Sequence, residues 1–182
     1  MTYGFIHIPK TSGVSLHRLI QANPSSNLSY LQHVSVLDTL RFFTFVRNPY
    51  ARIVSAYFYL KSNKDNETQV AISYIISRYT SFKDFVLNMD KDGLLEFIIH
   101  LKPMWTWVVN ENGVVIPKVF KIEEPEKIDA FLAENGISGW IGSPITNTSE
   151  HEPYESYLDS EIIDEINRVY EKDFELFNYA KK

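Results

Sequence analysis

The stretch FIHIPKTSGVSL, residues 5–16, decides the fold of this chain. Its apolar start favours a buried strand, which must end at Pro9 because proline has no N–H group for the hydrogen-bond ladder. Residues 10–13 then form an expected tight turn, and the residues that follow have apolar side chains at helical spacing. A strand that enters a helix through such a turn leaves several backbone N–H groups pointing one way, beside a lysine and the positive end of the helix dipole. The stretch therefore predicts a site for an oxyanion, either phosphate or sulfate.

A second stretch, FVRNPYARIVSAY at residues 45–57, repeats this arrangement. A short apolar strand ends at Arg47, and Pro49 stands where the start of a helix tolerates proline. Arg52 and Ser55 are three residues apart and would share one face of that helix. Because ligands of open α/β sheets bind at the carboxyl ends of the strands, these guanidinium groups and the hydroxyl predict a second site, for a phosphate dianion. The structural alternative leaves Arg47 as a cap of the strand and Arg52 as a solvated surface residue.

Strand and helix patterns alternate along the chain. They predict strands at 3–8 and 41–46 and a loop at 23–29. Helices are predicted at 14–22, 50–61, 124–136 and 158–179, and two or three more within 69–101. Gly136 would end the helix at 124–136, and Ser81 would be an N-cap. Residues 105–124 are typical of a strand, an Asn-Gly turn and a second strand, which would put Trp105 and Trp107 on one face, either in the core or as a platform for a sugar. The alternation predicts a single α/β domain over residues 1–182, with a mainly parallel central sheet flanked by helices.

The composition argues against several classes of function. A net charge of −5 disfavours a general binder of nucleic acids or other polyanions. The chain has no cysteine, so it has neither disulfides nor a zinc–thiolate site, and its His, Asp and Glu spacing indicates no metal site. Since the start of the sequence lacks a basic, apolar leader and no run approaches about 18 apolar residues, we expect a cytoplasmic protein without a membrane span.

Other nucleotide-binding classes have to be weighed against the first stretch. A Walker A loop has its glycines before the lysine, whereas Lys10 precedes Gly13, and Arg47 stands where a Walker B carboxylate would be. A kinase also needs carboxylates to hold Mg²⁺. From the residues alone, a nucleoside-triphosphate-dependent P-loop kinase and a non-catalytic nucleotide- or anion-binding module remain as alternatives.

PKTSGVS (residues 9–15), followed by RNPYARIVSAY (residues 47–57), resembles the sulfotransferase family that uses 3′-phosphoadenosine 5′-phosphosulfate (PAPS), and more narrowly the carbohydrate branch that includes heparan sulfate 2-O-sulfotransferases. The resemblance implies a P-loop-like sulfotransferase fold and transfer of a sulfuryl group from PAPS to an acceptor hydroxyl, with adenosine 3′,5′-bisphosphate as product. The residues it assigns to the donor are Lys10, Thr11, Ser12, Gly13, Val14 and Ser15 at the 5′-phosphosulfate, and Arg47 and Ser55 at the 3′-phosphate. Val14 departs from the family, which often has a threonine there.

QHVSVLD, residues 32–38, also resembles the carbohydrate branch, in which the histidine of such a segment is the catalytic base. The resemblance therefore implies that His33 accepts the proton of a saccharide hydroxyl during an in-line displacement, while Lys10 neutralises charge on the donor. Sulfuryl transfer of this kind needs no metal. Met104 stands where the family commonly has a glutamine, and His7, on the first strand, is expected to be a buried structural residue.

Overall fold

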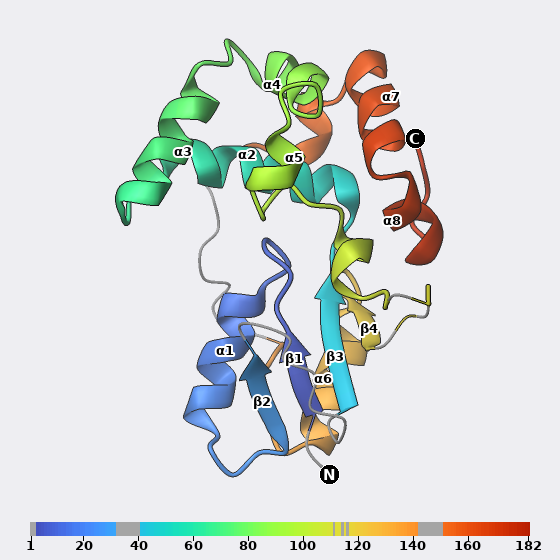
Figure 1. Cartoon of the computed structure of the whole chain (residues 1–182). Coiled ribbons are helices and arrows are strands. Elements are labelled where there is room, and N and C mark those ends of the chain that lie inside the picture. Colours follow the sequence, from blue (N-terminus) through green and yellow to red (C-terminus); the bar gives the residue numbers. More distant parts are fainter. Residues whose placement is uncertain (1–2, 32–40, 111, 114, 116, 142–150) are drawn as a thin grey trace. The chain divides into compact units, whose positions relative to one another are not determined.

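The computed structural model of the chain describes residues 3–31, 41–110, 112, 113, 115, 117–141 and 151–182. The chain forms two compact units, and each is made from two segments that are separate in the sequence. Met1–Arg47 and Met104–Asn147 form the first, which we call the sheet unit; Asn48–Pro103 and Thr148–Lys182 form the second, which we call the helical unit. All the described strands lie in the sheet unit (Figure 1).

Four parallel strands make the sheet of the sheet unit. They are β1 (Tyr3–Ile6), β2 (Leu28–Leu31), β3 (Arg41–Val46) and β4 (Lys118–Lys121), in the order β2-β1-β3-β4. Thr44 of β3 pairs with Ile6 of β1 and has no exposed surface, and its hydroxyl donates to the Ile6 carbonyl over 2.7 Å. Because the strands are parallel, all their carboxyl ends lie at one edge. The predicted α/β fold with a parallel sheet is confirmed.

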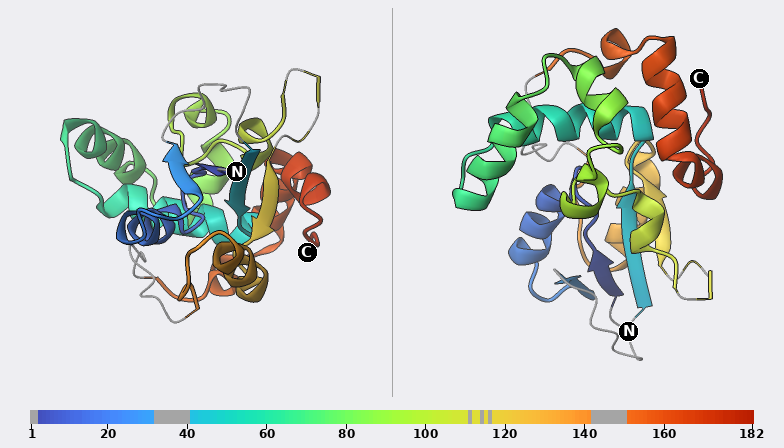
Figure 2. Two further views of the ribbon diagram at one scale, coloured as in Figure 1. Left: turned by 90° about the horizontal axis from the view of Figure 1, so that it is seen from below. Right: turned by 45° about the horizontal axis from the view of Figure 1, so that its top comes forward.

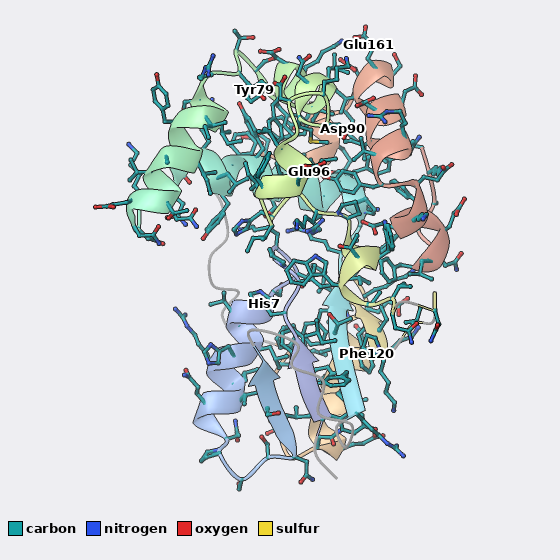
Figure 3. The ribbon with its side chains drawn as sticks, in the orientation of Figure 1. His7, Tyr79, Asp90, Glu96, Phe120 and Glu161 are labelled. Carbon is teal, nitrogen blue, oxygen red and sulfur yellow. The ribbon has the colours of Figure 1, made fainter. Side chains whose placement is uncertain are left out.

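Two helices, α1 (Gly13–Ala22) and α6 (Pro125–Glu134), pack on the same face of this sheet, as the left view of Figure 2 shows. Phe5, Phe43 and Phe45 point to that face, and none of them has exposed surface. Aromatic contacts continue to the sheet edge, where the rings of Phe120 on β4 (labelled in Figure 3) and Phe131 on α6 lie 4.8 Å apart between centroids. This aromatic core fixes α1, and therefore the turn before it, against β1.

The described elements of the helical unit are all helices. They are α2 (Pro49–Ser62), α3 (Glu67–Ser77), α4 (Phe82–Asn88), α5 (Leu94–Phe97), η2 (Tyr154–Tyr157), α7 (Ser160–Val169) and α8 (Glu171–Leu176). The expectation of helices within 69–101 is confirmed, and Ser81 caps α4 as predicted, its side chain accepting from the Asp84 N–H over 3.1 Å. No described helix has both the length and the apolar character needed to span a membrane.

Besides the helix expected at 158–179, which is divided into α7 and α8, the structure corrects two expectations of local structure. Residues 105–124 do not begin with a strand, because Trp105 and Trp107 lie in a 3-10 helix, η1 (Met104–Trp107). Of the expected hairpin, the described residues of this segment show one antiparallel bridge, between Val109 and Val115. The strand β4 does form, but its partner is β3 of the parallel sheet, and the argument that placed both tryptophans on one strand face is wrong.

The expected loop at 23–29 is the second correction. Its last two residues belong to β2, the edge strand that begins at Leu28 and pairs with β1. Serines and asparagines surround this strand in the sequence, so its four residues lack the apolar run that marks β3. Pairing along β1, a tertiary interaction, makes it a strand.

Candidate donor-binding site

The turn between β1 and α1 has a strained backbone. Lys10 and Ser12 both adopt the left-handed region, with φ of 68° and 65°, although neither is glycine. Such conformations cost free energy and persist only where the surrounding structure holds them, which is common at functional sites. Inside the turn, Thr11 has no exposed surface and its hydroxyl donates to the Ile8 carbonyl over 2.7 Å. The buried Thr11 hydroxyl thus stabilises the turn, and a backbone of this kind can direct several N–H groups towards one anion.

The start of α1 differs from the start of α2. At α2, the side chain of Asn48 accepts from the N–H groups of Tyr50 and Ala51, over 3.0 and 3.5 Å. At α1, the cap residue Ser12 accepts no side-chain hydrogen bond from the described helix, and the first turn contains no acidic residue. Neither the Ser12 side chain nor a carboxylate of the helix's own first turn therefore offsets the positive end of the α1 dipole, which favours binding of an anion.

Two cationic side chains lie at this turn, because β1 and β3 are neighbours and both end at the same edge of the sheet. Arg47, directly after β3, donates from Nη1 to the Lys10 carbonyl oxygen over 3.5 Å. Burial, and then the nearby Arg47 charge, lower the pKa of Lys10 to about 8. A bound dianion would offset the repulsion between the two cations and raise this pKa again. The arrangement suits a phosphate or a phosphosulfate.

Gly13, the first residue of α1, is required by space. A Cβ at this position would lie only 2.0 Å from Cδ2 of His7, so no other residue fits without a shift of the ring or of the helix. Ser15, on the same first turn, is buried, and Val14 is half-buried. The structure thus brings the predicted residues 10–15 together with Arg47 in one turn and one helix start, all within the sheet unit.

The helical unit holds the other two residues of the second predicted cluster. Arg52 and Ser55 are both buried on α2, at 2% and 4% exposure. Arg52 donates from Nη1 to the Lys102 carbonyl over 2.9 Å and lies near Tyr170 and Asp173. The expectation of a solvated surface residue is wrong for Arg52, because its side chain is buried and donates to a backbone carbonyl. Its role as a donor to the ligand stays a prediction. The role of Ser55 at the 3′-phosphate stays a prediction.

The remaining predicted residues stand as follows. His33 and its segment lie outside the described residues, so its role as a base stays a prediction. Met104 has no exposed surface, which makes it a packing residue of η1. In the described part of the chain, no three His, Asp or Glu side chains are grouped so that they could hold a metal ion.

The structure gives His7 a position that the sequence does not predict. It was expected to be only a buried residue of the first strand, whereas it follows β1 and its ring faces Gly13 at the start of α1. The sequence contains one indication of this contact, because a glycine at the start of a helix can mark the close approach of another group.

Comparison with known proteins identifies the family of the chain, and with it the sulfuryl donor. The model of the sulfotransferase family matches residues 7–180, from His7 before the strained turn to the last residues after α8. Comparisons with curated proteins and with solved structures found no match. The match covers nearly the whole chain and includes residues 9–15 and 47–57, the two motifs predicted to bind anions. It favours sulfuryl transfer over the kinase alternative, and it does not distinguish the heparan sulfate 2-O branch. The chain therefore belongs to the sulfotransferase family, and it is an enzyme that uses PAPS as its sulfuryl donor.

Proposed function

We propose that this sulfotransferase transfers the sulfuryl group of PAPS to a hydroxyl group of a carbohydrate, with His33 as the general base. The turn and helix start at residues 10–15 would bind the 5′-phosphosulfate, and Arg47 and Ser55 the 3′-phosphate. The observation that carries the proposal is the convergence of Lys10, Arg47 and the start of α1 at the carboxyl edge of the sheet. The carbohydrate acceptor and the base rest on the resemblance of residues 32–38 to the carbohydrate branch.

The proposed reaction is a single displacement at sulfur. The acceptor oxygen forms a bond to sulfur as the bond between sulfur and the 5′-phosphate oxygen breaks, and the acceptor proton passes to His33. Adenosine 3′,5′-bisphosphate leaves with the electron pair of the broken bond. Lys10 and the backbone N–H groups of the turn would stabilise the charge that develops on the leaving phosphate, where fixed donors contribute most. The 3′-phosphate contacts would position the sulfur without taking part in the bond changes.

The acceptor class is tested by incubating the protein with ³⁵S-labelled PAPS and a panel of neutral and lightly charged glycans, sulfated glycans and small alcohols. We expect label in a sugar ester, and more in neutral or lightly charged glycans than in heavily sulfated ones, because the chain carries a net charge of −5. Label confined to the non-carbohydrate alcohols would contradict the proposed acceptor and leave the donor assignment intact.

Adenosine 3′,5′-bisphosphate should raise the melting temperature of the protein more than ATP does. A ligand that binds only the folded state stabilises it by about 2.7 kcal/mol at a hundredfold excess over its Kd. ATP has no 3′-phosphate and would lose the contacts proposed for Arg47 and Ser55. The measurement is a thermal shift series at matched ligand concentrations, and equal shifts with both nucleotides would mean that no 3′-phosphate site exists.

Arg47→Ala should weaken the binding of ligands that carry the 3′-phosphate by roughly 2–4 kcal/mol, since the substitution removes one partner of a desolvated charge pair. Binding of adenosine 5′-phosphosulfate, which lacks the 3′-phosphate, should change much less. Calorimetric titration of both ligands against both proteins gives the comparison. Arg78→Ala, which removes the same charge from an exposed position on the helical unit, serves as the control. An equal loss for the two ligands would move Arg47 from the 3′-phosphate to the 5′ turn, whose Lys10 carbonyl it contacts.

A further inference from the structure

His7 occupies the junction between the central strand of the sheet unit and the start of α1. It directly follows β1 and is labelled in Figure 3. Its half-buried ring stacks on Phe5, with ring centroids 6.1 Å apart and planes 23° from parallel. Phe5 itself has no exposed surface and packs against Phe43 and Phe45 of the neighbouring strand, at 5.1 Å in both cases. The imidazole is therefore held in place by its contact with Phe5, which belongs to the aromatic core of the sheet.

The imidazole also lies against the first residue of α1. A Cβ placed on Gly13 would lie 2.0, 2.4 and 2.7 Å from Cδ2, Nε2 and Cγ of His7, so the ring lies directly in the direction that a side chain would take. Among the described residues, His17, four residues after Gly13 on the same face of α1, and Lys10 in the turn act on the ring electrostatically. Burial, followed by these two groups, lowers the pKa of His7 to about 4. The ring is thus neutral at physiological pH, and it adds no charge that repels the cations of the site.

We propose that His7 is a positioning residue for the PAPS-binding turn: its ring, fixed on Phe5, sets the position of Gly13 and so aims the first-turn N–H groups of α1 at the 5′-phosphosulfate. The inference rests on the proposed role of residues 10–15 in binding the donor. It adds a residue that would not itself touch PAPS. The physical reason is that hydrogen-bond donors stabilise a ligand only when they are held in place, and a displacement near 1 Å can cost about a hundredfold in rate.

A paired substitution tests the contact. Calorimetry would give the Kd of adenosine 3′,5′-bisphosphate for wild type, His7→Ala, Gly13→Ala and the double variant. Gly13→Ala should weaken binding about a hundredfold, because the new methyl group displaces either the ring or the helix start. His7→Ala should weaken it about tenfold, and the double variant should bind about tenfold more tightly than Gly13→Ala, because removing the ring makes room for the methyl group. His151→Ala, a histidine removed from the helical unit, is the control and should bind as wild type does.

A second readout separates positioning from a general effect on stability. For His7→Ala, the KM for PAPS should rise about tenfold while kcat at saturating PAPS stays within about threefold of wild type, since the bound donor restores the turn. This measurement also serves if Gly13→Ala does not fold. The inference is overturned if the double variant binds no more tightly than Gly13→Ala, or if His7→Ala leaves both Kd and KM unchanged. Lys10→Met distinguishes a failure of the proposed donor turn from a failure of the present inference. An unchanged Kd in Lys10→Met would refute the donor turn. A raised Kd in Lys10→Met, together with no coupling between His7 and Gly13, would refute only the role of His7.

Discussion

His33→Ala should lower turnover by about 10²–10⁴-fold, the usual contribution of a positioned proton acceptor, and leave the affinity for the donor nearly unchanged. The reason is the proposed division of the site: the base would face the acceptor hydroxyl, whereas the contacts with PAPS would come from the turn at residues 10–15, Arg47 and Ser55. The measurements are kcat with the best acceptor from the labelling panel and the Kd of adenosine 3′,5′-bisphosphate. A near-normal turnover would mean that His33 is not the base and that the resemblance of residues 32–38 marks structure only.

The pH profile gives the same test without relying on the size of a rate loss. Only neutral imidazole accepts a proton, so kcat/KM of wild type should rise with pH through the pKa of a histidine, ordinarily near 6.5. His33→Ala should lose this limb, and the control His17→Ala should keep it. A carboxylate base would put the limb at lower pH and keep it in His33→Ala. Among the acidic residues, Glu124 already pairs with Lys127 over 2.7 Å, an interaction that lowers the pKa of its carboxyl group.

Lys10→Met should lower kcat/KM by about 10²–10³-fold, comparable to the loss of one fixed donor at a developing anion. Lys10 stands at the strained turn, beside the start of α1 and Arg47, where the leaving phosphate would gain charge. Its charged form is disfavoured by burial and by Arg47 in the ligand-free protein, which lowers its pKa to about 8. The substitution should therefore not reduce the melting temperature of the free protein, and this separates lost chemistry from lost folding. An activity within threefold of wild type would show that Lys10 does not act on the donor.

The lowered pKa of Lys10 also predicts how donor binding depends on pH. A 5′-phosphate bound beside Lys10 would favour the charged amine, so the pKa of Lys10 in the complex should lie above 8. Between these two values binding takes up a proton, and the Kd of adenosine 3′,5′-bisphosphate should rise with pH from about 8 upward, by at most tenfold per pH unit. Lys10→Met should have a flat profile in this range. If wild type and Lys10→Met show the same slope, another group is responsible.

Much of the fold could be predicted from local patterns. The strand at 41–46 has the predicted bounds, because a continuous apolar run flanked by arginines leaves little choice of ends. The helices at 14–22 and 50–61 agree with α1 and α2 to within a residue or so, since periodicity and Pro49 define them. Ser81 caps α4, and Gly136, at a φ of 87°, follows the end of α6. These features depend on neighbours within about four residues, and the sequence displays such neighbours directly.

Tertiary contacts decided what the local patterns could not. The sequence placed Arg52 by helical periodicity alone, but the helical unit packs nearly every side of the first turns of α2, and so the guanidinium is buried at the Lys102 carbonyl. Alternation predicted a strand for Trp105 and Trp107, yet both residues lie in η1, and β4 takes its partner, β3, from a distant part of the chain.

For the candidate donor site too, some features follow from the sequence and others only from the tertiary structure. The sequence by itself determined that a lysine and a glycine stand between a strand and a helix, and that an arginine ends another strand. Only the sheet order, with β1 beside β3, brings Arg47 to Lys10, and only the packing of Phe5 brings the ring of His7 against Gly13. The physical reason is that strand order and ring packing depend on residues distant in the chain, whose pairing is selected by the burial of the whole core rather than by any local pattern.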